Sequence, residues 1–342
     1  MKSGFIVGHM KIVKCWVAVL LLLGLACVAP VWASKLEVKP AQAHEVQMGA
    51  YLTSLYDLDS SKGTFSADLW IWSKAPARLG FKLRMVEVTP LSSKFPHVYF
   101  GDNAYPLKEK VEYQVRKLQG TFLHNYEIKD FPFDKQLLKI HLENTEENAE
   151  FVRFLADPQS SYDKDITMDG WTIEGLRLVP ATKSYHSNFG YTPDSPSIEY
   201  SRVTLEISLK RDAPLIFFKV TLGLFVALIL AFLSSLLPAS NDDLFGARIA
   251  LLGGALLAVV VNQQFADAKS GDTTAVTLID ALHMLGSLSL LLLFIATFVS
   301  RRIATRETFP INARRFDRIA VIGISSIFWL PAGVLIVQAV YG

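Results

Sequence analysis

Four long apolar stretches in the second half of the chain constrain its fold more than any other feature. They cover residues 214–237, 245–265, 273–299 and 316–340. Each is long enough for a helix of about 20 residues to cross the hydrocarbon of a bilayer. The connections between them are short, except the third. The sequence therefore predicts an all-α transmembrane domain of four helices over residues 214–342.

The composition agrees with a membrane domain joined to a polar domain. Apolar residues make up 51% of the 342 residues and charged residues only 19%. This is too apolar for an ordinary soluble protein and too charged for a membrane bundle alone. The formal net charge of +2 gives no basic excess that would indicate a nucleic-acid partner, and intrinsic disorder is excluded as the main character.

Residues 1–33 have the pattern of a secretory signal peptide. Lysines precede an apolar run over residues 15–28, and Ala33 is the expected cleavage position. Cys27 leaves a lipoprotein site open as an alternative. Because Cys15 and Cys27 are the two cysteines of the chain, the exported part is expected to hold no disulfide and no thiolate metal site.

Residues 34–213 are polar and contain short alternating runs. From residue 203 to residue 210, odd positions are apolar and even positions polar, as in a strand with one buried face. Residues 81–85 and 138–142 alternate in the same way, and turn-rich segments separate such runs. We therefore expect an all-β, immunoglobulin-like antiparallel sandwich over residues 34–213.

Basic residues in the third connection predict the orientation in the membrane. The connection and its edges carry Arg301, Arg302, Arg306, Arg314, Arg315 and Arg318. Basic loops stay in the cytoplasm, which places the β domain and the carboxy terminus outside. The signal peptide independently predicts the same orientation.

One short motif connects the two domains with a known family. Residues 124–136 read HNYEIKDFPFDKQ. By itself, FPFD equally suits an ordinary hairpin turn, in which the proline fixes the turn and the phenylalanines bury. The segment resembles the FPFDxQ signature loop of pentameric ligand-gated ion channels, the Cys-loop receptor superfamily. The two cysteines that close this loop in animal members are replaced by His124 and Leu138, so the chain resembles the bacterial branch that lacks the disulfide.

Three further motifs follow in the family's order. They are the W-x-I of residues 171–173, a basic residue shortly before Pro214, and the T-x-I-D of residues 277–280. The resemblance covers nearly all of residues 45–342. It implies a homopentamer around a central pore in the bacterial inner (cell) membrane, with the large N-terminal domain in the periplasm. The implied function is a ligand- or proton-gated ion channel.

The resemblance also implies which residues line the pore. Counting from the basic residue of the second span, they are Arg248, Ala250, Gly254, Leu257, Val261, Gln264, Phe265 and Ala268. Leu257 would form a hydrophobic constriction that stops ions by excluding water. The family's hydroxyl residues and glutamate are replaced by Ala250, Gly254 and Ala247, so ion selectivity stays open. Alternatively, Gly246, Ala250 and Gly254 form a small-residue ridge for helix packing.

A ligand site at the junction of two subunits is implied in the same way. The candidate aromatic residues are Trp70, Trp72, Tyr99, Tyr105, Phe151, Phe154, Tyr185, Phe189 and Tyr191. Aromatic faces attract organic cations, which makes an amine a natural ligand. Each of these side chains could instead belong to the core or to a strand face.

Coupling between the domains is expected through three loops, residues 57–63, 130–136 and 267–277. The implied coupling residues are Asp59, Phe131, Pro132, Phe133, Asp134, Arg211 and Asp280. Arg211 could pair with Asp134 or Asp59, or remain a solvated cation. His283 and Lys219 lie inside predicted spans, where ionisable groups are functional candidates unless they reach an interface or a partner.

An enzyme and a non-conducting sensor are the two other classes of protein that the sequence has to be compared with. The sequence contains no Gly-rich phosphate loop, no H-E-x-x-H and no G-x-S-x-G, so no enzyme activity and no cofactor is predicted. His124 and His141 could meet as a metal pair, but two ligands without a third are weak evidence for a site. A non-conducting, membrane-anchored sensor or interaction protein of the same fold remains the alternative to a channel.

Overall fold

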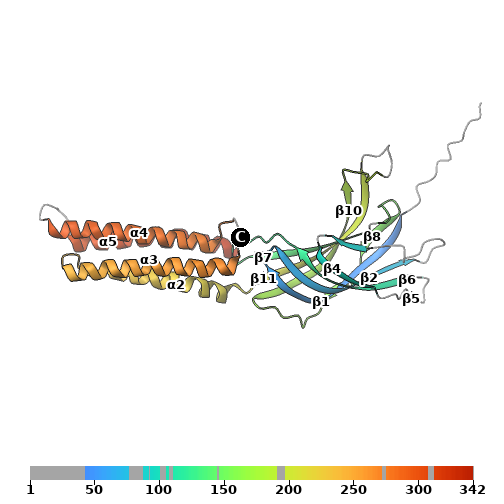
Figure 1. Cartoon of the computed structure of the whole chain (residues 1–342), viewed down its shortest axis with the longest axis horizontal. Coiled ribbons are helices and arrows are strands. Elements are labelled where there is room, and N and C mark those ends of the chain that lie inside the picture. The colour runs from blue at the N-terminus through green and yellow to red at the C-terminus, as the bar shows by residue number, and fades with distance from the viewer. Residues whose placement is uncertain are drawn as a thin grey trace, which may run out of the picture. The chain divides into compact units, whose positions relative to one another are not determined.

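The structure of the chain is a computed structural model. It describes residues 43–76, 88–91, 93–100, 105–107, 111–144, 146–190, 197–271, 275–306 and 312–341. A β-rich region from His44 to Arg211 precedes four long helices (Figure 1). The predicted signal peptide and the alternating run at residues 81–85 lie outside the described residues.

The strands are long near the middle of the β-rich region and short at its edges. They are β1 (His44–Asp59), β2 (Thr64–Pro76), β3 (Val88–Leu91), β4 (Ser93–Phe100), β5 (Tyr105–Leu107), β6 (Val111–Leu123), β7 (Lys135–Asn144), β8 (Val152–Ala156), β9 (Ser161–Tyr162), β10 (Trp171–Tyr185) and β11 (Ile198–Arg211).

These strands form two sheets. In the first, the order is β4-β6-β2-β1-β8, with β5 paired to β6 and β9 paired to β1. In the second, the order is β10-β11-β7-β3. Neighbours pair antiparallel, except that β1 runs parallel to β8 and β9. Most neighbouring strands therefore run in opposite directions, as the alternating sequence pattern predicts.

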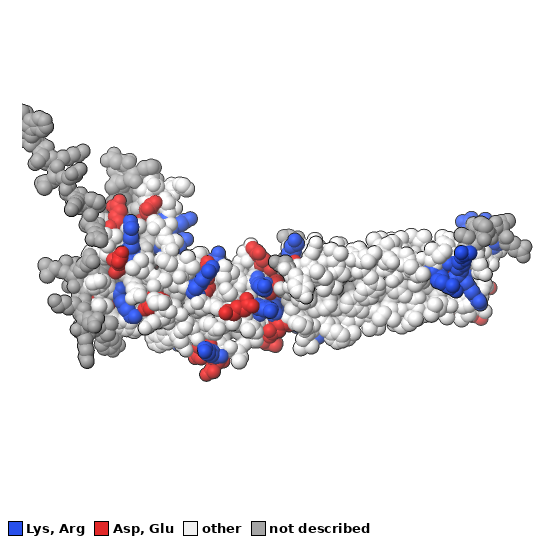
Figure 2. Space-filling view, turned by 180° about the vertical axis from the view of Figure 1, so that it is seen from behind, with Lys and Arg blue, Asp and Glu red and all other residues white. Residues whose placement is uncertain are grey.

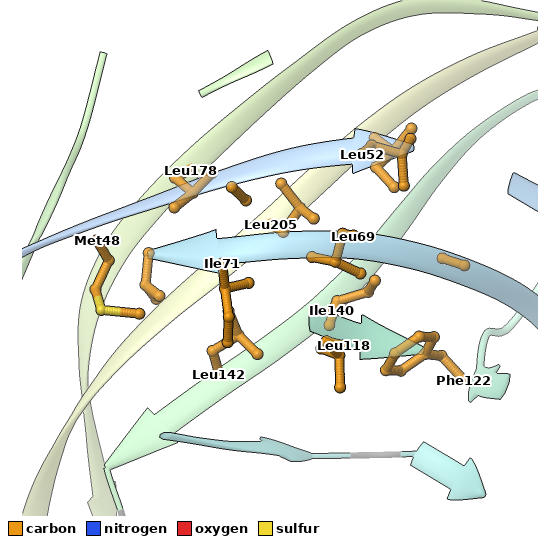
Figure 3. Packing of buried hydrophobic residues seen from close by; sticks show 14 of the residues in the cluster. Met48, Leu52, Leu69, Ile71, Leu118, Phe122, Ile140, Leu142, Leu178 and Leu205 are labelled. Atoms are coloured by element: carbon orange, nitrogen blue, oxygen red, sulfur yellow. The ribbon is translucent and has the colours of Figure 1, made fainter. Parts of the chain in front are cut away.

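One hydrophobic core joins the two sheets (Figure 3). Met48, Leu52, Leu69 and Leu118 come from the first sheet and meet side chains of the second, such as Leu205. In β11 the apolar residues at odd positions from 203 to 209 are all buried, which confirms the alternation read from the sequence. Burying a leucine side chain of this kind contributes roughly 1.5–3 kcal/mol.

The four helices are α2 (Ala213–Ser234), α3 (Asp242–Ser270), α4 (Leu278–Thr305) and α5 (Ala313–Tyr341). All four are long and apolar enough to cross a membrane. The prediction of a multi-pass membrane protein is confirmed at this level. On the face shown in Figure 2, basic side chains gather at one end of the helices, and a largely uncharged stretch follows.

The ends of the helices differ from the predicted spans by a few residues. The Asn241 side chain accepts a hydrogen bond from the Leu244 N–H and caps α3. Thr277 and Asp280 form a capping box that begins α4 at Leu278. Capping side chains determine where a helix begins, whereas hydropathy marks only the part that fits the hydrocarbon, so the two boundaries do not coincide.

Candidate functional site

An ion pair links the last residue of β11 with the FPFD segment. Arg211 Nε lies 2.7 Å from Asp134 Oδ1, and its Nη2 lies 3.1 Å from Asp134 Oδ2. The Asp134 carboxylate is almost fully buried, and it also accepts a hydrogen bond of 2.8 Å from Gln136 Nε2. Of the alternatives that the sequence left open for Arg211, the structure has the pair with Asp134.

Aromatic rings enclose the Arg211 guanidinium. Its Cζ lies 4.0 Å from the centroid of the Trp171 ring and 4.9 Å from that of Phe131. Phe131 is buried and belongs to the hydrophobic cluster of the helices, and the Phe133 ring lies 5.4 Å from Phe217 of α2. The FPFD segment, which includes the buried Pro132, therefore packs against the helical domain. It also contacts Arg211, which lies two residues before the start of α2.

Two hydrogen bonds connect loops of the β region with the ends of helices. The Leu278 N–H, at the start of α4, donates to the Lys129 carbonyl oxygen over 2.8 Å. Ser60 Oγ, in the β1–β2 turn, donates to the Ser270 carbonyl oxygen at the end of α3 over 2.9 Å. Gly271 has a φ of +92°, and a Cβ there would lie 2.8 Å from Ser60 Oγ, so this approach requires glycine.

The remaining predicted coupling residues stabilise these loops internally. The Lys62 side chain and backbone N–H both donate to Asp59, and the side-chain hydrogen bond is the main cause of the lowered pKa of that carboxyl. Asp280 accepts hydrogen bonds from the Thr277 N–H and hydroxyl, each of 2.8 Å. Among the described residues, the hydrogen bonds of both carboxylates stay within their own loops, so both residues act on loop shape.

Partly buried polar groups flank the FPFD segment. His124 Nε2 lies 3.3 Å from Gln136 Oε1, and its ring packs edge-on against Tyr126. Burial lowers the pKa of His124 and raises the pKa of the Tyr126 phenol, whose hydroxyl donates to the Thr64 carbonyl oxygen. Burial also lowers the pKa of His141. Both histidines line a cavity of about 520 Å³ together with Glu127, Lys135 and Lys139.

An exposed stripe runs along α3. Leu257 is 66% exposed and Val261 is 56% exposed on the single chain. The other exposed members are Ala250, Gly254, Gln264, Phe265 and Ala268. The opposite side of α3 packs into the bundle through Leu252, Ala255 and Val259. The stripe therefore takes no part in packing within one chain.

The position of Arg248 in the structure corrects its predicted role as a pore-lining residue. It is 1% exposed and lies inside the bundle, where Nη2 pairs with Asp317 of α5 over 3.0 Å and Nε donates to Thr297 of α4. At 100° per residue, Arg248 stands about 200° from Ala250 around the helix, which is the packed side. It does not belong to the stripe that the other predicted residues form.

A polar bridge joins three helices. Asn262 Oδ1 accepts the Leu224 N–H of α2 over 2.9 Å and lies 3.2 Å from His283 Nε2 of α4. A Cβ at Gly223 would lie 2.9 Å from the Asn262 side chain, so glycine allows this approach. His283 Nδ1 faces the Ile279 carbonyl oxygen at 2.8 Å. A neutral imidazole has one N–H and can donate to only one of these two oxygens.

Intramembrane Lys219 differs from His283. It is exposed on α2, whereas His283 is fully buried and has partners on two elements. The exposed lysine therefore fits the interface interpretation, since a long side chain can reach the headgroup region.

Part of the predicted aromatic set forms a cluster. The Tyr185 and Phe189 rings lie 5.4 Å apart, and both contact Tyr200 of β11. The Tyr185 hydroxyl donates to Glu143, which also pairs with Arg202. Burial and the Glu143 hydrogen bond raise the pKa of Tyr185. Phe189 is 65% exposed and has a φ of +51°, so the cluster has one open aromatic face.

Other members of the predicted aromatic set lie elsewhere. Phe154 is 3% exposed in the core of the β region, which corrects its assignment to a ligand site. The Trp72 Nε1–H donates to Asp157, and its ring packs on Gly49. Trp70 is exposed on β2, and Phe151 is exposed just before β8. The side chains of Tyr99 and Tyr105, and all of Tyr191, lie outside the described residues.

No group of three or more His, Asp or Glu side chains suitable for a metal ion occurs in the described part of the chain. No protein-family model matches the chain, and no curated protein matches it.

Three contributors were missed by sequence reasoning. Tyr200 completes the aromatic cluster, Asn262 bridges the helices, and Asp317 neutralises Arg248. The sequence does contain a signal for Asn262 and for Asp317. Asn262 is an amide inside an apolar span, and Asp317 is an acidic residue within an arginine-rich segment.

Proposed function

We propose that the chain is one subunit of a homopentameric ion channel of the pentameric ligand-gated type. An immunoglobulin-like periplasmic domain would bind a small molecule or protons at subunit junctions, and α3 would line the pore across the bacterial inner membrane. The other partners are lipids and the permeant ions. The observation that carries the proposal is the outward stripe on α3.

The stripe has the composition expected of a pore wall. Its members recur at steps of three and four residues, so they lie on one helical face. Leu257, Val261 and Phe265 are its bulky residues, and Gln264 adds a polar side chain nearer the β region. Five copies of such a face around an axis would surround a space with an apolar constriction near Leu257. Apolar constrictions of this kind gate by excluding water.

The junction contacts support a path from the β region to α3. The β1–β2 turn bonds to the end of α3 through Ser60, and Lys129, two residues before the FPFD segment, bonds to the start of α4. A shift of either loop would change the position of the helix end to which it is attached. A ligand that binds one arrangement more tightly shifts the population toward it.

The open face of Phe189 supports an organic cation as the ligand. Tyr185, Phe189 and Tyr200 present aromatic surface on a loop and two adjoining strands. The Ala149 N–H bonds to the Glu199 carbonyl oxygen, which brings the loop before β8 beside this cluster. Cation–π attraction of about 1–2 kcal/mol per ring would favour an amine there.

Flux through liposomes that contain the full chain tests the proposal, with a screen of pH and of small amines. Leu257→Ala should raise basal flux because a smaller side chain widens the constriction and lets water enter. Leu256→Ala is the matched control, since Leu256 is also exposed but lies about 100° from Leu257 around the helix. Equal basal flux in the conducting wild type and in Leu257→Ala would contradict the pore assignment.

One observation favours the second candidate, a non-conducting sensor. Added Cβ atoms at Gly246 and Gly254 would meet nothing within 4 Å, so these glycines with Ala250 form an open ridge of small residues. Ridges of this kind let helices approach closely. A tightly packed oligomer without flux under any tested ligand or pH would support the sensor.

A further inference from the structure

We propose that a cavity at the arginine-rich end of the helices binds the phosphate headgroup of an anionic glycerophospholipid. The cavity has a volume of about 310 Å³. One wall is the α2–α3 connection, with Ser235, Leu236, Leu237 and Pro238. The other wall is the first part of α5, with Arg314, Asp317, Arg318, Val321 and Ile322.

Two arginines give the cavity a positive edge. Arg314 and Arg318 are exposed and stand one helical turn apart on α5. Neither has an ion pair with any residue that the structure describes. Two guanidinium groups at this spacing can bind the oxygens of one phosphate. Their planar N–H groups match the positions of phosphate oxygens better than a lysine ammonium does.

The acidic residue between them does not cancel this charge. Asp317 lines the cavity, but its carboxylate pairs with Arg248 over 3.0 Å, and both side chains are buried. The negative charge of Asp317 is therefore balanced from inside the bundle. The charges of Arg314 and Arg318 remain available to a ligand from outside.

The apolar part of the cavity indicates a lipid and not a free anion. Leu236 is 76% exposed and Ile322 is 62% exposed on the single chain. Ile322 lies roughly 6 Å further along α5 than Arg318, toward the middle of the span. A phosphate at the arginines would leave these side chains uncovered, whereas the acyl chains of a lipid would lie along them.

An unpaired hydroxyl provides a second, independent observation. Ser235 lines the same cavity, and its buried Oγ has no hydrogen-bond partner in the described part of the structure. Buried hydroxyl groups in folded proteins are nearly always paired. A rotation of the Ser235 side chain toward the cavity would let its hydroxyl donate to an ester or phosphate oxygen of a bound headgroup.

The test uses the purified full chain in detergent, titrated with phosphatidylglycerol or phosphatidylcholine of the same chain length. Phosphatidylglycerol should bind more tightly and raise the thermal midpoint more. The double variant Arg314→Gln with Arg318→Gln should bind it roughly 25-fold more weakly, at about fivefold per arginine. Ile322→Trp should also weaken binding while both arginines remain, because it fills the apolar part of the cavity.

The matched control is Arg302→Gln with Arg315→Gln, which removes the same charge from exposed positions outside the cavity wall. If both double variants lost the same affinity for phosphatidylglycerol, binding would depend on overall charge and not on this cavity, and the proposal would be overturned. Equal affinities for phosphatidylglycerol and phosphatidylcholine would overturn it as well. Glycerol 3-phosphate binding as tightly as phosphatidylglycerol would contradict a lipid site. None of these outcomes depends on whether the protein conducts ions.

Discussion

Arg211 combines three interactions in one side chain. It forms a two-pronged pair with Asp134, lies over the Trp171 ring and contacts the Phe131 ring. Removing one member of a buried pair leaves the other charge without compensation, which costs about 3–5 kcal/mol. Arg211 is therefore the residue at which the FPFD segment and β11 depend most on each other.

We expect Arg211→Gln to lower the thermal midpoint of the purified protein and to reduce agonist-evoked flux. Arg211→Lys should recover only part of both, since lysine keeps the charge but lacks the planar fork and the stacking surface. Differential scanning fluorimetry and liposome flux give the two readouts. A lysine variant indistinguishable from wild type would show that charge alone matters.

His124 should make the junction sensitive to acid. Its pKa in the folded protein lies below the ordinary value of 6.5 because the ring is buried. The unfolded chain thus takes up a proton at a higher pH than the folded chain. The stabilising effect of neutral His124 is present above 6.5 and is lost as pH falls through that value toward the lowered pKa.

The corresponding measurement is the thermal midpoint of wild type and His124→Gln between about pH 7.5 and about pH 5.5. The variant should lose less stability on acidification than wild type. His141→Gln is a useful comparison, because burial lowers the pKa of His141 as well but the residue lies within β7. Parallel pH profiles for wild type and His124→Gln would refute this role.

At the scale of the element, Asn262 connects α2, α3 and α4 through one amide oxygen. Asn262→Ala and His283→Ala should each lower the thermal midpoint, because each leaves a buried polar group with one partner fewer. In a double-mutant cycle the two should be non-additive by about 1 kcal/mol. Strict additivity would mean that the two side chains do not interact.

The sequence predicts the four helices and the alternating parts of β7 and β11, because hydropathy and alternation are local properties. The FPFD segment is likewise a local motif; Phe131 is buried as expected, whereas Phe133 is only partly buried. Helical periodicity alone could have separated Arg248 from the stripe, since two residues correspond to about 200° of rotation. The Asp317 partner could not be found in this way, because it requires the relative position of α3 and α5.

The predicted aromatic set also shows that contacts between distant segments cannot be predicted from local sequence. Phe154 is apolar on an alternating strand and belongs to the core, whereas Tyr185 and Tyr200 meet only because β10 pairs with β11. Residue type indicates that a ring could bind a cation. Which rings face each other depends on strand register, and no single segment determines it.

At the scale of the whole molecule, the decisive question is whether the α3 stripe is in contact with water and whether the stripes of several subunits surround one axis. Val261→Cys should react with a water-soluble thiol reagent, because Val261 lies on the stripe. Leu252→Cys should not react, because Leu252 is buried on the opposite side of α3. Mass photometry or light scattering should give a particle of five subunits. A monomer, or no labelling at Val261 in any condition, would contradict a shared pore.

The bond between the Leu278 N–H and the Lys129 carbonyl oxygen consists of main-chain atoms only. Its existence does not depend on which side chains occupy the two positions. Alanine scanning across either segment would leave this hydrogen bond in place. Such a scan would therefore underestimate how strongly the two segments are connected. Proline at position 278, where the first turn of a helix accommodates it, or an amide-to-ester replacement would remove the donor. The side chain of Lys129 could therefore vary without loss of this bond, whereas that of Leu278 is held by its place in the buried cluster of the helices.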